Sequence, residues 1–406
     1  MNILFIVPEE YEGDRWGGVT TYSLYTARQL YAQGNSVSIL TPGEKPAHDI
    51  QQGIHIYKVW GDNKHGLLDK VIHKIFPKVL ARIYWQRAVL RFVRAHNTFT
   101  IIEAPEWGSS TLFLSIYKIS TIVVRLHRST YQYLKDNDLP VKIEDRIINV
   151  LEWLSIVFAN AVTAPTVFMS TQHSLLTAVF KIIKKTIEII PNGVSMHDTY
   201  RAKSLRVKYK RILFVGRLEI GKGCDCLIQA IEKVLVEVPT VQLLMIGEDT
   251  HMYINNVYCS FKHQLLSFIS NKKMKQHIRF IPRVRNSQLY RYYKTCSVFV
   301  IPSVGYENCP MSLLEAISYN LPVVGSNAGG IPEIINHTRA GLLFKQRDSN
   351  DLADKILLLL HNTHTREAIM QNIQKEKYTY DITRTALLTK DLYQKLSGKS
   401  GKRQRI

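Results

Sequence analysis

No run of apolar residues in the sequence is long enough to cross a bilayer, for which about 20 nearly uncharged residues are needed. The most apolar window, residues 147–169, is interrupted by Glu152, Asn160 and Pro165. The basic segment of a secretory signal peptide is also absent, because Asn2–Val7 leads directly into a proline and two glutamates. We therefore expect a cytoplasmic protein that is soluble or rests on the surface of the membrane.

Cysteine is scarce. The five cysteines are odd in number and scattered along the chain: Cys224, Cys226, Cys259, Cys296 and Cys309. This pattern argues against a disulfide framework and favours a reducing compartment. The pair Cys224 and Cys226 lacks a second pair at metal-binding spacing, so it predicts helix packing, and we expect no metal site.

Acidic residues are outnumbered, with 33 Asp and Glu against 53 Lys and Arg, for a net charge of +20. Such a charge suggests an anionic partner: a small molecule, a lipid surface or a nucleic acid. The basic residues are dispersed and no nucleic-acid-binding motif is present, so we expect no nucleic-acid partner. The densest mixture of basic and apolar residues, 67–94, fits either a helix lying on anionic lipid or an ordinary surface helix.

Short β-branched runs alternate with helical patterns along 406 residues, which predicts an α/β protein of two domains. The halves begin alike, because Asn2–Val7 and Arg211–Gly216 are both apolar strands that lead into a glycine-bearing loop. We expect two Rossmann-like, doubly wound domains facing a cleft. The predicted boundaries are 1–194 for the N-terminal domain, 195–382 for the C-terminal domain, and 383–406 for a C-terminal helix and a frayed basic tail. The helix, Thr383–Leu396, is expected to pack back on the first domain.

The loop that follows the strand at 212–215 combines three glycines with Arg217 and Lys222. Backbone N–H groups at a helix N-terminus favour phosphate, and a guanidinium fork with an ammonium group suits a diphosphate. The Gly-Lys-Ser/Thr ending of a Walker loop is absent. Simple turn chemistry remains the alternative interpretation of this loop.

A second unit places two carboxylates at the end of a buried strand, 298–301. Glu307 lies in the loop, Pro310 suits the first turn of a helix, and Glu315 falls within that helix. Carboxylates accept charge-assisted hydrogen bonds from sugar hydroxyls. The alternative is that Glu307 favours the helix N-terminus while Glu315 is a solvated helix residue.

Glu307 and Glu315 are separated by seven residues and are followed by Leu321–Ser326 and then Gly329–Glu333. Together with Gly216–Gly223, the turn Pro191–Val194 and the pair Gly17-Gly18, this pattern resembles the family-4 retaining glycosyltransferases of the GT-B fold. The resemblance covers essentially the whole chain. It implies that 1–194 is the acceptor-side domain and 195–382 the nucleotide-sugar-binding domain.

The resemblance implies a role for each matching residue. Glu315 would hold the ribose of the donor, and Glu307 would contact the transferred sugar. Arg217 and Lys222 would neutralise the diphosphate, so that no metal or other cofactor is expected. The remaining implied donor contacts are Gly17 and Gly18 near the phosphates and sugar, Asn308, Cys309, Pro310 and Met311 through the backbone, and Arg283 and Val284 near the nucleobase.

In the first half, His127 follows a strand, and the resemblance implies that it faces the donor sugar; a lone histidine is otherwise a packing or capping residue. Glu103 and Glu106 close another strand and are weaker candidates for acceptor binding. Asn160 and Ser195 depart from the Asp that the family usually has at these positions, and we interpret both positions as structural.

We expect transfer from a nucleotide-sugar to a glycan or lipid-linked acceptor, in the synthesis of cell-surface or exopolysaccharide glycans. An anionic membrane surface is a further candidate partner. Two alternatives are a glycoside hydrolase, whose two carboxylates would flank the scissile bond, and a non-catalytic binder of nucleotides or anionic polymers. The hydrolase leaves the phosphate loop without a purpose.

Overall fold

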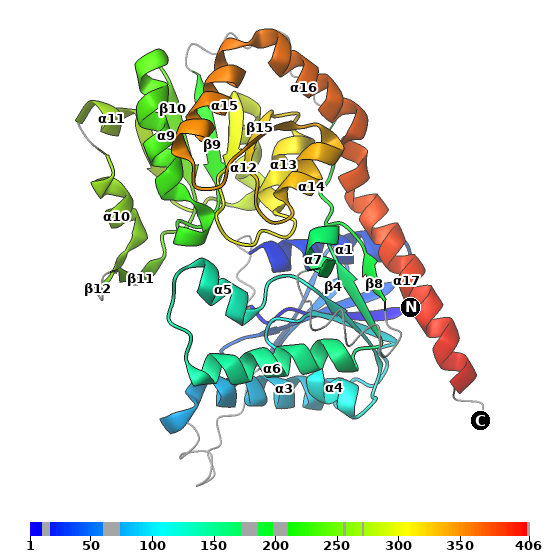
Figure 1. The fold of residues 1–406 in the computed structure, drawn as a ribbon. Coiled ribbons are helices and arrows are strands. Elements are labelled where there is room, and N and C mark those ends of the chain that lie inside the picture. The colour runs from blue at the N-terminus through cyan, green and yellow to red at the C-terminus, as the bar shows by residue number, and fades with distance from the viewer. Residues whose placement is uncertain are drawn as a thin grey trace. The chain divides into compact units, whose positions relative to one another are not determined.

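The computed structural model describes residues 1–9, 17–59, 74–171, 186–197, 210–254, 257–269 and 272–403. The chain divides into two compact units (Figure 1). Unit 1 comprises Met1–Lys135, Pro140–Gly193 and Ile382–Ile406, and unit 2 comprises Asp136–Leu139 and Val194–Asp381. Residues 198–209, which follow the predicted domain boundary at 194, lie outside the described residues.

Unit 1 is built on an eight-stranded sheet in the order β3-β4-β2-β1-β5-β6-β7-β8. Its strands are β1 (Asn2–Ile6), β2 (Ser36–Pro42), β3 (Ala47–Gln51), β4 (Ile54–Val59), β5 (Ile101–Pro105), β6 (Thr121–Arg125), β7 (Ala161–Ala164) and β8 (Ile187–Ile189). All neighbours are parallel except β3, which pairs antiparallel with β4 at the edge. Sequence analysis missed β3 because it is polar and largely exposed, and so lacks an apolar signal. The strand order reverses between β1 and β5.

Each face of this sheet carries its own core, as the alternation along β1 shows. Leu4 and Ile6 pack in one apolar cluster, whereas Ile3 and Phe5 pack in the other, because successive side chains of a strand point to opposite faces. The first face is covered by α3 (Pro77–Ala95), α4 (Leu112–Ile116) and α6 (Ile143–Phe158), which lie side by side (Figure 1). The second is covered by α1 (Gly18–Ala32) and α17 (Ile382–Arg403). The shorter helices of unit 1 are α5 (Thr130–Asp136) and α7 (Val167–Thr171).

The C-terminal helix α17 belongs to unit 1, where it contacts α1. The Tyr393 hydroxyl donates a hydrogen bond of 2.7 Å to the buried carboxylate of Glu103 in β5. Thr385 similarly donates to the carbonyl oxygen of Pro191. The prediction of a frayed tail after Leu396 was wrong for residues 397–403, where the helix continues, and residues 404–406 lie outside the described residues. The lysine and arginine residues of this stretch have good helix propensity and offset its two glycines.

Unit 2 contains a fully parallel six-stranded sheet in the order β13-β10-β9-β14-β15-β16. The strands are β9 (Arg211–Val215), β10 (Gln242–Ile246), β13 (Ile278–Ile281), β14 (Val298–Ile301), β15 (Val323–Ser326) and β16 (Gly341–Phe344). A separate hairpin, β11 (His251–Ile254) with β12 (Val257–Ser260), was not predicted. The order reverses between β9 and β14, and the prediction of two doubly wound α/β sheets is confirmed.

Helices flank the sheet of unit 2 and connect its strands. They are α9 (Cys224–Glu237), α10 (Phe261–Ser267), α11 (Lys272–His277), α12 (Asn286–Thr295), α13 (Met311–Ser318), α14 (Ile331–Thr338), α15 (Ser349–His361), α16 (Thr363–Glu376), and the 3-10 turns η1 (Ile220–Lys222) and η2 (Lys377–Tyr380). Among the described residues of both units, no helix is at once long and apolar enough to cross a membrane.

Candidate active site

The carboxyl ends of β9 and β14 form the switch point of unit 2, where doubly wound folds bind ligands. The loops that leave these strands are joined by their backbones. Val304 and Gly305 both donate to the carbonyl oxygen of Gly221, at 3.0 and 3.1 Å. The phosphate loop that was predicted after β9 and the carboxylate loop after β14 are therefore one hydrogen-bonded structure.

Glycine is required where these loops approach each other most closely. Gly223 has a φ of +64°, and a Cβ atom there would lie 2.1 Å from the carbonyl oxygen of Pro302. At Gly247, after β10, a Cβ atom would lie 1.8 Å from the carbonyl oxygen of Gly216. These contacts exclude any other residue at both positions. The contact of Gly223 with Pro302 joins the loops after β9 and β14, so that the side chains at 222 and 307 come within reach of each other.

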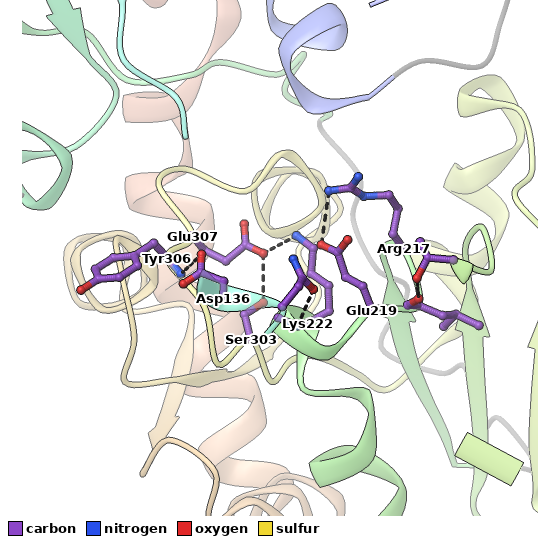
Figure 2. A network of polar contacts seen from close by, with 11 residues as sticks. Asp136, Arg217, Glu219, Lys222, Ser303, Tyr306 and Glu307 are labelled. Atoms are coloured by element: carbon purple, nitrogen blue, oxygen red, sulfur yellow. Dashed lines mark hydrogen bonds and ion pairs between the residues drawn. The ribbon is translucent and has the colours of Figure 1, made fainter. Parts of the chain in front are cut away.

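Lys222 and Glu307 form an ion pair across the two loops (Figure 2). The same oxygen of Glu307, Oε1, also accepts a 3.0 Å hydrogen bond from the Ser303 hydroxyl. The side chains of Lys222 and Glu307 are 21% and 12% exposed, so solvent still reaches both. The structure thus brings together a predicted phosphate ligand and a predicted sugar ligand.

Arg217 lies in the same loop as Lys222, and its guanidinium donates to Glu219 at 3.2 Å (Figure 2). The Glu219 carboxylate is fully buried, whereas the Arg217 side chain is 49% exposed. The buried carboxylate therefore anchors one edge of the guanidinium and leaves the rest of it accessible. Sequence analysis missed Glu219, because nothing in the loop pattern separates an anchoring carboxylate from a solvated one.

The backbone of Glu307 is held by the glycines that were noted only as part of the family pattern. Gly330 donates a hydrogen bond of 2.6 Å to the carbonyl oxygen of Glu307. Gly329 has a φ of +62°, and a Cβ atom there would lie 2.3 Å from that same oxygen. Gly329 and Gly330 therefore position the loop that carries Glu307.

The segment Asn308–Met311 leads into α13, with Pro310 as the N-cap residue. Cys309 and Met311 are buried, at 5% and 9% exposed. The side-chain oxygen of Asn308 is buried and has no hydrogen-bond partner among the described residues. The N–H groups at the start of an eight-residue helix favour negative charge at this point.

Glu315 lies one turn into α13 and accepts a 2.7 Å hydrogen bond from the hydroxyl of Tyr293. Burial raises the pKa of Glu315 to about 7, and the bond from Tyr293 opposes that shift. The rings of Tyr293 and Tyr319 stack at 5.6 Å, and His197 stacks on Tyr319 at 4.5 Å. Glu315 therefore lies beside an aromatic group and is not a solvated helix residue.

Arg283 and Val284 follow β13 at the same edge of the sheet, and both are half-buried. Arg283 pairs with Glu248, which follows β10, at 3.3 Å. The predicted nucleobase residues are thus separated from the ion pair of Lys222 and Glu307 by the ends of β10 and β9.

Two residues from the first half of the chain complete the unit-2 loops, and sequence analysis missed both. The side-chain oxygen of Asn137, which is 1% exposed, accepts a 3.0 Å hydrogen bond from the N–H of Gly221. Asp136 accepts one of 3.1 Å from the N–H of Tyr306 (Figure 2). The polar turn that contains them carries no motif, so only the tertiary structure reveals its role.

In unit 1, Gly17 and Gly18 stand at the N-terminus of α1. Gly17 is the N-cap, and a Cβ atom there would lie 3.0 Å from the Glu9 carboxylate, which also accepts a 2.7 Å bond from Thr20. The glycine at 17 therefore allows close packing within unit 1 itself.

Glu103 is 3% exposed, and its two oxygens accept hydrogen bonds from the hydroxyls of Tyr22 and Tyr393, at 3.0 and 2.7 Å. Burial raises the pKa of Glu103, while the charge of Arg125 acts in the opposite direction. Arg125 is 1% exposed and lies 3.9 Å from the centre of the Tyr22 ring. This geometry supports a packing role for Glu103 and gives no support to acceptor binding.

Glu106 is fully buried, and both of its oxygens accept from the backbone N–H of His127, at 2.9 and 2.7 Å. Burial raises the pKa of Glu106 to about 8, and the nearby Glu152 adds to the shift. His127 is half-buried against Tyr22, and burial followed by the charge of Arg125 lowers its pKa to about 3. The His127 ring is therefore neutral at pH 7, in a loop that Glu106 holds in place.

Two known protein families match this chain, one in each half. The family model described as Glycosyltransferase Family 4 matches residues 16–198, and the one described as Glycosyl transferases group 1 matches residues 196–376. The chain is a family-4 glycosyltransferase. Its fold is GT-B, as the predicted resemblance implied.

Three similar proteins show the breadth of this likeness. The phosphatidyl-myo-inositol mannosyltransferase of Mycobacterium leprae is 24% identical over 381 residues, which cover 90% of this chain and 89% of that protein. The sucrose-phosphate synthase of Thermosynechococcus elongatus superposes with a TM-score of 0.75 at 17% identity, covering 98% and 99% of the two chains. Anabaena HepE, solved with UDP and glucose, has a TM-score of 0.70 at 18% identity, covering 97% and 99%.

One departure of this glycosyltransferase from the family pattern has a clear local role. The side-chain oxygen of Asn160 accepts a 2.8 Å hydrogen bond from the N–H of Ile122, where an Asp carboxylate would also serve. Ser195 is exposed. Within the described ranges, no cluster of three or more His, Cys, Asp or Glu side chains is arranged to hold a metal ion.

Proposed function

We propose that this glycosyltransferase transfers a sugar from a nucleoside diphosphate sugar to an acceptor hydroxyl with retention at the anomeric carbon and without a metal ion. The observation that carries the proposal is the ion pair of Lys222 and Glu307, formed where two adjacent parallel strands end and the topology reverses. A cation that binds phosphate and a carboxylate that binds sugar hydroxyls are needed side by side for such a donor.

In this proposal, Lys222 and Arg217 stabilise the negative charge that develops on the leaving diphosphate, which is commonly the largest contribution to catalysis of this kind. Both cations are already held by carboxylates, Glu307 and Glu219, so little reorganisation is needed when the donor binds. The N–H groups at the start of α13 add favourable potential for the same charge.

Glu307 and Asn308 supply the sugar contacts. The buried Asn308 oxygen is an acceptor without a protein partner among the described residues, so a sugar hydroxyl that donates to it would remove an unfavourable buried group. Glu315 would accept from the ribose, with Arg283 and Val284 framing the base. His127, as a neutral ring, would face the sugar, with Gly17 and Gly18 near the phosphates.

In the proposed reaction, no side chain of the enzyme acts as a nucleophile. The acceptor oxygen attacks the anomeric carbon on the face from which the diphosphate leaves, the bond from that carbon to the diphosphate breaks, and the acceptor proton passes to the departing phosphate oxygen. Because attack and departure share one face, the anomeric configuration is retained.

The setting we propose is the synthesis of cell-surface or exopolysaccharide glycans on the cytoplasmic face of the membrane, with a glycan or lipid-linked acceptor. The similar mannosyltransferase is named for a phosphatidylinositol acceptor, which supports including lipids in an acceptor screen. HepE was solved with UDP, which supports testing uridine donors first.

The deciding experiment incubates the purified protein with a panel of nucleotide-sugars and follows free nucleoside diphosphate by mass spectrometry. We expect one donor to be consumed, and NMR of the product to show the donor's anomeric configuration. Binding of nucleotide without turnover of any donor, in the presence of a lipid and glycan acceptor panel, would instead identify a non-catalytic binder.

A further inference from the structure

The helix α6 has its polar and apolar residues in an unusual arrangement. Its three acidic side chains, Glu144, Asp145 and Glu152, are buried at 7%, 1% and 1% exposed. Its exposed apolar side chains include Ile143 at 69% and Val150 at 53%. An ordinary surface helix has the reverse pattern, with its acids in water and its large apolar residues in the core.

The buried acids are all engaged inside unit 1. Glu144 accepts from the backbone N–H groups of Lys78 and Val79 at the start of α3. Asp145 pairs with the Lys78 ammonium at 2.9 Å. Glu152 accepts hydrogen bonds from the backbone and the hydroxyl of Thr130, at 3.0 and 2.5 Å. The acids of α6 therefore fasten neighbouring segments and contribute no negative charge to its outer side.

The outer side of α6 is a single stripe, which we call the α6 face. At 100° per residue, its members fall within one arc of the helix. They are Ile143, Arg146, Ile147, Val150, Leu154 and Phe158, of which Ile147 and Leu154 are half-buried and the others exposed. Phe158, at the end of the helix, is 51% exposed.

The neighbouring helices extend this surface with the same chemistry. Arg87, Arg91 and Arg94 of α3 lie at i, i+4 and i+7 and are exposed. Beyond the end of α4, Tyr117 is 57% exposed and lies under the guanidinium of Arg94 at 4.9 Å. Among the described residues of α3, α4 and α6, every exposed charged side chain is basic.

We propose that the α6 face, together with the arginines of α3, docks this enzyme on an anionic membrane surface. Exposed apolar side chains between cations match the boundary of headgroups and acyl chains, where apolar burial and attraction to anionic lipid act together. From the segment 67–94, for which the sequence left open a lipid-bound helix or an ordinary surface helix, α3 contributes its exposed arginines to this surface. The apolar residues of α3, such as Leu80 and Val93, face the core at 2% and 1% exposed. The docking surface rests on the proposed function in one respect: a lipid-linked acceptor would explain why the enzyme needs a membrane.

The test measures co-sedimentation of the protein with vesicles of phosphatidylglycerol and phosphatidylcholine, and with vesicles of phosphatidylcholine alone. We expect binding to the anionic vesicles that weakens as salt is raised. Val150→Glu should lower the vesicle affinity about tenfold, since it removes one apolar insertion worth ~1.5 kcal/mol in transfer energy. Its matched control is Val236→Glu on α9, where the valine is 76% exposed and far from these helices in sequence, and which should leave binding unchanged.

A second pair of variants separates charge at this surface from net charge. Arg87→Glu with Arg91→Glu should lower the affinity by at least about 25-fold, at roughly fivefold for each basic residue. Lys272→Glu with Lys273→Glu on α11 changes the net charge equally and should have a much smaller effect. Equal losses in the two double variants would overturn the proposal, as would equal losses for Val150→Glu and Val236→Glu.

Two further outcomes would also overturn it. The first is absence of binding by the wild-type protein. The second is self-association in solution that Val150→Glu abolishes while vesicle binding persists, since the α6 face would then join two copies. Lys222→Ala should keep full vesicle binding, so a failure of the proposed chemistry is distinguishable from a failure of the docking surface.

Discussion

In both units the sheet has an edge at the carboxyl ends of the strands where the topology reverses. The charged residues at this edge differ in burial between the two units. In unit 1 the acids there, Glu103 and Glu106, are buried, bonded to protein partners and raised in pKa. In unit 2, Lys222 and Glu307 form a partly exposed ion pair. Burial disfavours the charged form of a group, so of these four residues it is Lys222 and Glu307 that keep charges accessible to a ligand. This difference supports our proposal that the donor binds at unit 2, while the acids of unit 1 hold its framework together.

The largest expected effect is on the unit-2 edge. Lys222→Ala should lower kcat/KM about 100- to 1000-fold, because it removes a cation that stabilises the leaving group. Its melting temperature should stay close to that of the wild type. The measurement is release of nucleoside diphosphate at a fixed donor concentration. Lys233→Ala is the control, since Lys233 pairs with Asp354 in a solvent-exposed bridge on α9 and α15, and its kcat/KM should be unchanged. If both variants had the same kcat/KM, the assignment of Lys222 to the active site would be wrong.

The next effect is on stability, at the unit-1 edge. Glu103→Ala should lower the free energy of unfolding by about 3 kcal/mol, because it leaves the hydroxyls of Tyr22 and Tyr393 without their buried acceptor and removes the charge that interacts with buried Arg125. Tryptophan fluorescence during urea unfolding can follow unit 1 alone, since all five tryptophans precede residue 194: Trp16, Trp60, Trp85, Trp107 and Trp153. If Glu103→Ala left the stability unchanged and raised the KM for the acceptor, the contrast between the two units would be wrong, and Glu103 would be assigned to acceptor binding.

A smaller effect is expected in the pH dependence of stability. The pKa of Glu106 is raised by burial from its usual 4.5 to about 8, so the folded state binds an extra proton between these values. The contribution of Glu106 is fully present below pH 4.5 and is lost as the pH rises towards and through 8. Glu106→Gln should remove this slope, at most ~1.4 kcal/mol per pH unit. Urea unfolding of both proteins across this range tests it; identical slopes would contradict the assignment.

The smallest expected effect is that of a chelator. EDTA should leave donor turnover unchanged, because Arg217 and Lys222 supply the positive charge that a divalent ion would provide. Loss of turnover that magnesium or manganese restores would show that this interpretation of the loop is wrong.

Sequence analysis found the strands and the helices that flank the site because their apolar periodicity is strong. The family resemblance further predicted that Lys222 and Glu307 contact the same donor, Lys222 at the diphosphate and Glu307 at the sugar. Sequence analysis missed β3 and the hairpin of β11 and β12, which are polar or short. It also missed Ser303, although this residue lies just before the loop of Glu307, and Asn137, whose neighbours in sequence carry no motif. For Glu103 and Glu106 it could not separate an exposed carboxylate from a buried one.

The sequence by itself determined the doubly wound architecture, the glycines at 223 and 329, and the family, because each depends on local pattern and backbone conformation. The tertiary structure alone decided which charges remain accessible. Burial of an acid depends on residues far away in the chain, as with Glu103 and Tyr393, or Glu144 and the start of α3. The same long-range contacts turn the acids of α6 inward and leave its outer face apolar and basic.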